Sequence, residues 1–203
     1  MVPSVIRFWR GAALSLLLGL APLAPAAAKD AASIEASAQQ LRPGGFVWEP
    51  ADATQGPVEI VISLGSQRAF VYRGGTLIGV STISSGKTGH ESPTGRFQIL
   101  QKRQLHRSNR YNDAPMPFMQ RLNWYGVALH AGPIPGYPAS HGCIRLPTKF
   151  AQKLYEATEV GSFVFVAGGE IGTAEAALKL ARANASAPMS ADRTPAGASR
   201  TAP

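Results

Sequence analysis

The chain has 203 residues with 20 lysines and arginines, 12 aspartates and glutamates and one cysteine, which gives a formal net charge of +8. A chain of this length can fold as one domain of ordinary size with a hydrophobic core. A single cysteine excludes an internal disulfide.

The N-terminal segment has the order of features of a secretory signal peptide. Arg7 and Arg10 precede an uncharged stretch rich in Leu and Ala, and a run of three alanines ends at Ala28. The alternative is an uncleaved membrane anchor, but the apolar stretch of about 14 residues contains Pro22 and is shorter than the roughly 20 that a spanning helix needs. We expect residues 1–28 to be cleaved, which predicts a periplasmic mature protein without a transmembrane anchor. Nucleic acid is an unsuitable partner for an exported chain.

The two flanks of the remaining chain offer few apolar residues. Residues 29–56 are rich in Ala, Gln, Gly and Pro, and we expect a partly disordered linker with anchoring contacts at residues 46–48. Residues 169–203 predict a low-complexity tail rich in Ala and Pro. Beyond a short helix at Ala174 to Ala183, we expect the tail to be mostly disordered.

Residues 57–168 carry the signals of a folded, mainly β domain. Apolar and β-branched runs separated by turns predict strands at residues 58–63, 69–73, 76–83, 97–101, 125–130 and 162–167. Thr148 can cap a helix whose apolar residues share one face, so that the helix packs on the sheet. No internal repeat and no second domain is expected.

Positive charge is concentrated in residues 87–121, which hold seven basic residues against Glu91 and Asp113. Such a segment is either an ordinary solvated face or a surface for an anionic partner. For an exported chain, an acidic wall polymer or a peptide that bears carboxylates is the better partner.

Cys143 is the candidate catalytic residue, because an exported protein has little reason to keep a free thiol. A thiol needs a positioned imidazole to become a nucleophile at neutral pH. Either His130 or His141 could serve as the base. We favour His130, since a residue from a separate strand can approach the sulfur end-on, whereas neighbouring side chains on one face run nearly parallel. His90 and His106 lie in polar segments and are expected to be surface residues.

The residues around Cys143 suit acyl transfer. Gly142 has no β-carbon, so the N–H groups of Gly142 and Cys143 can converge on an oxyanion. Arg145 supplies a fixed positive charge for a substrate carboxylate. Zinc is the competing interpretation of the cysteine and the histidines, but no paired motif such as CxxC or HExxH accompanies them. We expect neither a metal nor another cofactor.

The run HAGPIPGYPASHGCIRLP, from His130 to Pro147, closely resembles the active-site motif of the L,D-transpeptidase (YkuD-type) catalytic domain. In that family a histidine precedes the sequence [Ser/Thr]-His-Gly-Cys. Upstream, VEIVISLGSQRAFVYRGG and STISSGKTGHESPTGRF resemble the family's opening strands and its Pro-Thr-Gly turn. The resemblance covers most of residues 57–168. It implies a β-sandwich or barrel-like sheet with one short packing helix and an active-site loop.

The resemblance also implies a peptidoglycan enzyme. Members attack the third residue of a tetrapeptide stem, release D-alanine and hold the stem as a cysteine thioester, which an amine resolves. Carried over, Cys143 is the nucleophile and His130 the general base and acid. Gly142 and Cys143 are the oxyanion donors, and Arg145 engages a stem carboxylate. His141 and Ser140 shape the site.

Several alternatives remain open at this level. The acceptor can be another stem, a lysine of an outer-membrane lipoprotein, a free D-amino acid or water, and water would make the protein an L,D-carboxypeptidase or cross-link hydrolase. A wall-binding module without catalysis is a third class.

Residues 101–121 are either a loop over the cleft or a plain surface loop. Ala131 stands where a glycine is frequent, which leaves open what holds the tautomer of His130, for which the family uses the carbonyl just after the histidine. The sequence does not determine the oligomeric state.

Overall fold

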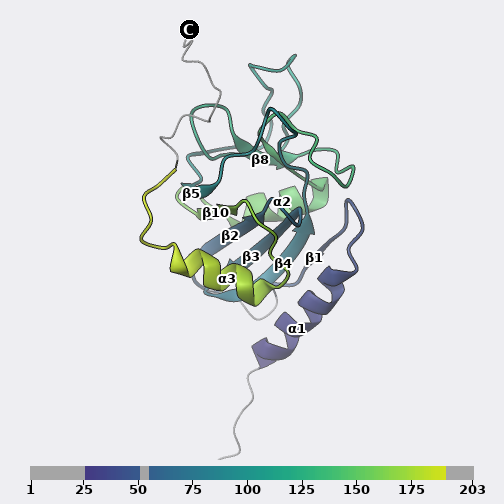
Figure 1. Cartoon of the computed structure of the whole chain (residues 1–203), viewed down its shortest axis with the longest axis vertical. Coiled ribbons are helices and arrows are strands. Elements are labelled where there is room, and N and C mark those ends of the chain that lie inside the picture. Colours follow the sequence, from purple (N-terminus) through teal and green to yellow (C-terminus); the bar gives the residue numbers. More distant parts are fainter. Residues whose placement is uncertain (1–25, 51–54, 191–203) are drawn as a thin grey trace, which may run out of the picture.

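The computed structural model describes residues 26–50 and 55–190, and this part of the chain forms two β-sheets with three helices around them (Figure 1). The larger sheet contains, in order, β1 (Phe46–Trp48), β4 (Thr76–Thr82), β3 (Arg68–Arg73), β2 (Val58–Ser63), β10 (Phe163–Ala167) and β5 (Gly95–Gln98). The smaller sheet contains β6 (Gln101–Arg103), β7 (Met119–Arg121), β8 (Ala128–Ala131) and β9 (Ile144–Leu146). The mainly β fold predicted from the sequence is confirmed.

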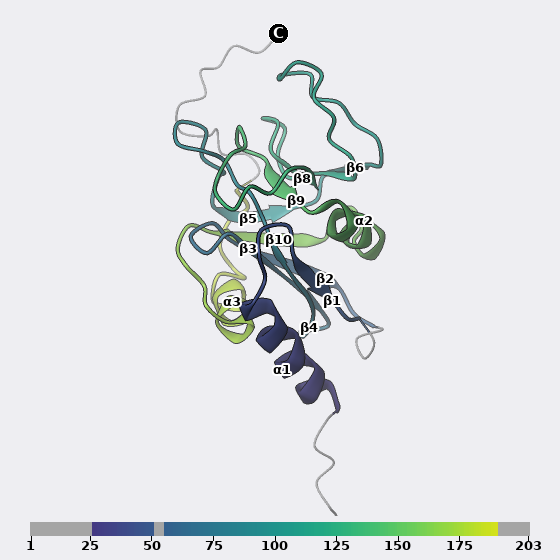
Figure 2. The same cartoon turned by 90° about the vertical axis from the view of Figure 1, so that its right-hand side faces the viewer.

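The larger sheet is covered on both faces. Helix α2 (Thr148–Ala157) and the smaller sheet pack on one face, whereas α1 (Ala26–Gln39) and α3 (Ala174–Ala183) lie on the other (Figure 2). Along β2, Ile60 and Ile62 belong to the first core and Val61 to the second. Because successive side chains of a strand point to opposite faces, this two-sided burial explains the continuous apolar run in the sequence.

The N-terminal flank differs from the linker that we expected. In α1, Ile34 and Ala38 are buried in the second core, and β1 pairs with β4 as an antiparallel edge strand. The Glu35 carboxylate accepts a hydrogen bond from the Ala174 N–H at 2.9 Å, which joins α1 to the first residue of α3. The apolar residues of this flank therefore pack on both faces of the larger sheet: Ile34 and Ala38 belong to the second core and Val47 packs against it, whereas Phe46 and Trp48 pack against the first.

The C-terminal flank is also more ordered than a mostly disordered tail. Helix α3 has the bounds expected from the sequence, and the Thr173 side chain caps its N-terminus. Further on, Ser190 is buried, and its N–H donates to the Arg96 carbonyl at 2.6 Å. The folded unit therefore extends beyond residues 57–168 on both sides. Residues 1–25, which hold most of the expected signal peptide, and residues 191–203 lie outside the described part of the chain.

Three local expectations need correction. The strand expected at residues 97–101 is divided, because the chain leaves the larger sheet at Gln98 and enters the smaller one at Gln101. The strand expected at residues 125–130 begins only at Ala128, after a turn in which Gly126 has a φ of +99°. Thr148 is the first residue of α2 rather than its cap. No helix among the described residues is long and apolar enough to cross a membrane.

Candidate active site

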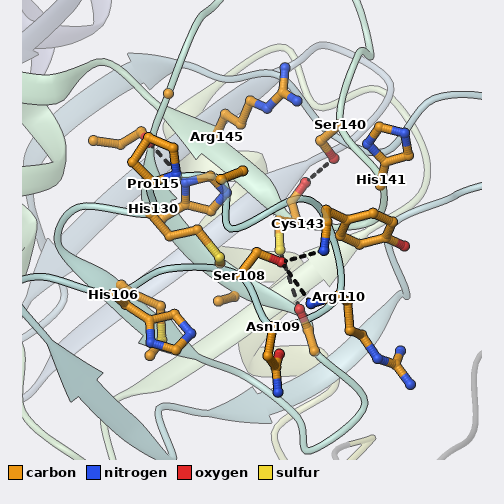
Figure 3. Close-up of a pocket in the computed structure, with 18 of the residues that line it drawn as sticks. His106, Ser108, Asn109, Arg110, Pro115, His130, Ser140, His141, Cys143 and Arg145 are labelled. Carbon is orange, nitrogen blue, oxygen red and sulfur yellow. Dashed lines mark hydrogen bonds between the residues drawn. The ribbon is translucent and has the colours of Figure 1, made fainter.

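A cavity of about 350 Å³ lies beside the smaller sheet (Figure 3). Its lining comes from three parts of the chain: residues 106–121, residues 126–133 around β8, and residues 140–145 leading into β9. Of the six residues predicted for the site, five line this cavity, namely His130, Ser140, His141, Cys143 and Arg145. Gly142 is instead buried inside the turn before Cys143.

The alternation of side chains along two parallel strands brings the candidate catalytic residues to one cavity. In the pairing of β8 with β9, His130 lies opposite Arg145. Leu129 and Ile144 point into the first core, so the residues next to them point to the opposite face of the sheet. His130, Arg145 and Cys143, which directly precedes β9, therefore face the same cavity.

His130 is held in one tautomer by the backbone. The ring is only 8% exposed, and its Nδ1 lies 2.8 Å from the Ala131 carbonyl. A carbonyl can only accept, so Nδ1 carries a hydrogen and Nε2 is left with its lone pair. Burial lowers the pKa of His130 to about 4, and the positive charge of Arg145 adds to this, although the hydrogen bond to Ala131 opposes it. The carbonyl of the residue after the histidine therefore fixes the tautomer, although this residue is alanine and not glycine.

The Cys143 thiol is protonated in the resting site. Its Sγ donates to the Gly126 carbonyl at 3.3 Å. Burial raises the pKa of the Cys143 thiol, and the Ala128 N–H and the charge of Arg145 only partly oppose this shift. Cys143 and His130 therefore rest as a neutral thiol and a neutral imidazole rather than as an ion pair.

The turn of residues 140–143, called the cysteine turn below, is fixed by serine hydroxyls. Ser140 Oγ accepts from the Gly142 N–H at 3.1 Å and donates to the Cys143 carbonyl. Ser92 Oγ donates to the Gly142 carbonyl and accepts from the Gly86 N–H, both at 2.9 Å. The N–H groups of Ser140 and Arg145 also donate to the Ser85 and Ser84 carbonyls, so the backbone on both sides of the cysteine is bound to residues 84–92.

These bonds bear on the expected pair of oxyanion donors. Gly142 has a φ of +112°, a conformation that L-residues with side chains rarely adopt. Its N–H donates to the Ser140 hydroxyl. Of the expected pair of donors, the Cys143 N–H is therefore the one that this hydroxyl does not hold. An oxyanion could use the Gly142 N–H only after that group releases Ser140.

His141 makes contacts of a different kind from those of His130. Its exposed ring stacks on Tyr111, with centroids 4.7 Å apart and an interplanar angle of 28°. The His90 ring meets it edge-on at a centroid distance of 4.9 Å. Partial desolvation and the charge of Lys87 lower the pKa of His141. His141 thus joins two loops at the mouth of the cavity, whereas His130 is buried and locked.

The segment between β6 and β7 lies over the cavity, and we call residues 104–118 the cover. Of the two alternatives for this segment, a loop over the cleft or a plain surface loop, the structure has the first. His106, expected at the surface, is half-buried and lines the cavity, and sequence reasoning also missed the contact of Tyr111 with His141. The nearest sequence signal was the group of apolar residues within this basic segment.

The cavity is positively charged. Arg110, Arg121 and Arg145 line it, and none of the described residues that line it is acidic. Arg110 is partly engaged, since its Nη1 donates to the Tyr125 carbonyl at 2.8 Å. Such a lining favours a ligand that bears carboxylates.

A family model for the YkuD L,D-transpeptidase catalytic domain matches residues 57–166, which is more than half of the chain. The chain belongs to this L,D-transpeptidase family. The match includes the cysteine turn, His130 and the strands of both sheets, with the exception of β1. Helices α1 and α3 lie outside it, so the family match leaves out the elements on the far face of the larger sheet.

Solved L,D-transpeptidases share the fold. One from Stackebrandtia nassauensis is 25% identical with a TM-score of 0.53, and the alignment covers 74% of this chain and 70% of that one. One from Mycobacterium smegmatis is 23% identical with a TM-score of 0.51, covering 55% and 59%. One from Xylanimonas cellulosilytica is 24% identical with a TM-score of 0.50, covering 59% and 65%. This chain therefore spans about three fifths of the latter two proteins. Among curated proteins, no relative matches.

Proposed function

We propose that this protein is an exported L,D-transpeptidase that acts on peptidoglycan tetrapeptide stems through a thioester on Cys143. The observation that carries the proposal is the placement of Cys143 and His130 on one face of two parallel strands, in a cavity lined by three arginines. Family membership supports the reaction class. The signal-peptide pattern of residues 1–28 supports export to the periplasm.

In the first half-reaction, the sulfur of Cys143 attacks the carbonyl carbon of the third stem residue while Nε2 of His130 takes the thiol proton. A C–S bond forms, the carbonyl oxygen becomes an oxyanion, and the Cys143 N–H donates to it. The C–N bond to the terminal D-alanine then breaks. Its amine takes the proton from His130, and a thioester remains on Cys143.

The neutral resting pair suits this sequence of proton transfers. A proton that moves to His130 forms an imidazolium that is more acidic than an ordinary one, because burial lowers the pKa of His130. Such an acid readily returns its proton to the departing amine. The same histidine can therefore act as base during attack and as acid during release, without a stable ion pair in between.

In the second half-reaction, an amine attacks the thioester carbonyl and gives a proton to His130. The C–S bond then breaks, the proton moves from His130 to the departing sulfur, and the thiol of Cys143 and the neutral imidazole are restored. A diaminopimelate amine of another stem would give a 3-3 cross-link, and a lysine of an outer-membrane lipoprotein would give an attached lipoprotein. Arg145, on the cavity face beside His130, would engage a stem carboxylate.

Product analysis tests the proposal. Purified protein is incubated with disaccharide tetrapeptide, and the products are identified by mass spectrometry, with Cys143→Ala as the control. We expect cross-linked dimers from the wild type and no product from the variant. Tripeptide alone would show a hydrolase. Folded wild type that forms neither product would contradict both enzymes and favour a wall-binding module.

A further inference from the structure

The cover (residues 104–118) is bonded mainly within itself. Ser108 Oγ accepts from the N–H groups of Arg110 and Tyr111 at 3.3 and 3.1 Å, and Arg107 pairs with Asp113 at 2.9 Å. The ends of the cover are joined by a hydrogen bond from the Phe118 N–H to the Gln104 carbonyl. The cover is therefore a preformed ribbon whose tip presents Arg110 and Tyr111.

The tip of the cover is attached at two places near the thiol. The Tyr111 ring stacks on His141, two residues before Cys143. Arg110 donates to the Tyr125 carbonyl, next to the Gly126 carbonyl that accepts the Cys143 thiol. A β-carbon added at Gly126 would lie 3.4 Å from Cδ of Arg110, so the arginine passes close over this turn. In Figure 3, His141 and Arg110 both lie near Cys143.

The attachment through Tyr111 is a chain of three rings from three loops. We call Tyr111, His141 and His90 the aromatic clasp. Tyr111 is 42% exposed and has no place in either main core, so its removal should not disturb packing there. A stacked pair of this kind stabilises a contact enough to shift a closed-to-open ratio by about 2- to 10-fold. The clasp can therefore hold the cover closed and still let it open.

We infer that Tyr111 is a positioning residue that, through the aromatic clasp, keeps the cover closed over Cys143 and thereby favours an amine over water as acyl acceptor. This inference rests on the proposed function. Water must be kept from the thioester while the acceptor amine is awaited, and a closed cover excludes it. An open cover exposes the same thioester to hydrolysis. The clasp would thus set the ratio of transfer to hydrolysis rather than the chemistry of acylation.

The test combines two readouts. The rate of Cys143 alkylation by iodoacetamide at fixed pH measures access to the thiol and does not depend on any peptidoglycan activity. The ratio of tripeptide to dimer in the disaccharide tetrapeptide assay measures the choice of acceptor. The variants are Tyr111→Ala, which removes the ring, and Tyr111→Phe, which keeps it. Tyr137→Ala is the matched control, because Tyr137 is an exposed tyrosine outside the clasp.

We expect Tyr111→Ala to speed alkylation about 2- to 10-fold and to raise the tripeptide-to-dimer ratio by a similar factor. Tyr111→Phe and Tyr137→Ala should match the wild type. Equal alkylation of wild type and Tyr111→Ala, or faster alkylation with an unchanged product ratio, would overturn the inference. Wild type without any product would refute the proposed function instead. His90→Ala removes the other ring contact and tests the clasp again if Tyr111→Ala does not fold.

Discussion

The two sides of the cavity are built differently. The wall, made of β8, β9 and the cysteine turn, shares its strands with the first core, where Leu129 and Ile144 are fully buried. The cover has Leu105 84% exposed, and its ion pair between Arg107 and Asp113 is solvent-exposed on both sides. Exposed pairs of this kind contribute about 0 to 1 kcal/mol. The proposed catalytic groups are thus fixed by the core, whereas a weakly held segment lies over them.

The largest contrast should appear between two histidines that line the same cavity. His130→Gln removes the proposed base, which lies in the wall, and we expect the rate of tripeptide and dimer formation to fall by about 10² to 10⁴. His106→Gln changes a residue of the cover and should reduce the rate by less than about 10-fold. Both rates are measured with disaccharide tetrapeptide by mass spectrometry. A larger loss in His106→Gln than in His130→Gln would assign proton transfer to the cover.

Stability should show the same contrast between core and cover. Ile34 in α1 is fully buried, and Ile34→Ala should lower the free energy of unfolding by about 2 to 5 kcal/mol. Leu105 in the cover is exposed, and Leu105→Ala should change it by less than about 0.5 kcal/mol. Urea unfolding measures both. If Ile34→Ala behaved like Leu105→Ala, α1 would not belong to the cooperative unit.

Acid should weaken the wall through His130. Its pKa in the folded protein is about 4, against 6.5 as the ordinary value, so the unfolded chain binds the proton more readily. Because the folded protein keeps this ring neutral, the free energy of unfolding is at its full value above pH 6.5. It decreases as the pH falls towards 4, by up to about 3 kcal/mol. Urea unfolding at several pH values should show this extra loss in wild type and not in His130→Gln. Parallel pH profiles would mean that His130 titrates normally.

The smallest contrast concerns two serines with similar bonding. Ser140 is buried and holds the Gly142 N–H and the Cys143 carbonyl, so Ser140→Ala should lower the free energy of unfolding by about 1 to 3 kcal/mol. Ser108 accepts two N–H groups in the cover, where water can replace it, and Ser108→Ala should lower it by less than about 1 kcal/mol. A larger loss for Ser108→Ala would show that the cover is part of the rigid framework.

The local sequence pattern was sufficient to predict much of the fold. β2 and α3 have the bounds that the sequence predicted, because a β-branched run and a capped amphipathic segment are signals read within a few residues. The division of residues 97–101 between two sheets was not predictable, since it depends on which strands stand beside each half. The packing of the N-terminal flank was not predictable either, because Ile34 is buried only where the sheet and α3 cover it.

The site shows the same division. Cys143, His130 and Arg145 could be chosen from residue types and spacing, because sulfur, imidazole and guanidinium chemistry and strand alternation are properties of the sequence. The preference for His130 over His141 as the base stays a prediction, and burial and the hydrogen bond to Ala131 are what distinguish His130. The role of Tyr111 could not be foreseen, because its partner His141 is thirty residues away along the chain.

By itself, the sequence determined the family and the mainly β fold and indicated the candidate catalytic residues, since these follow from residue chemistry and from short-range periodicity. Only the tertiary structure decided the tautomer of His130, the neutral state of the thiol and the closure of the cover. The physical reason is that desolvation and hydrogen-bond partners depend on which segments meet in space. Contacts between residues far apart in the chain leave no local pattern by which they could be read.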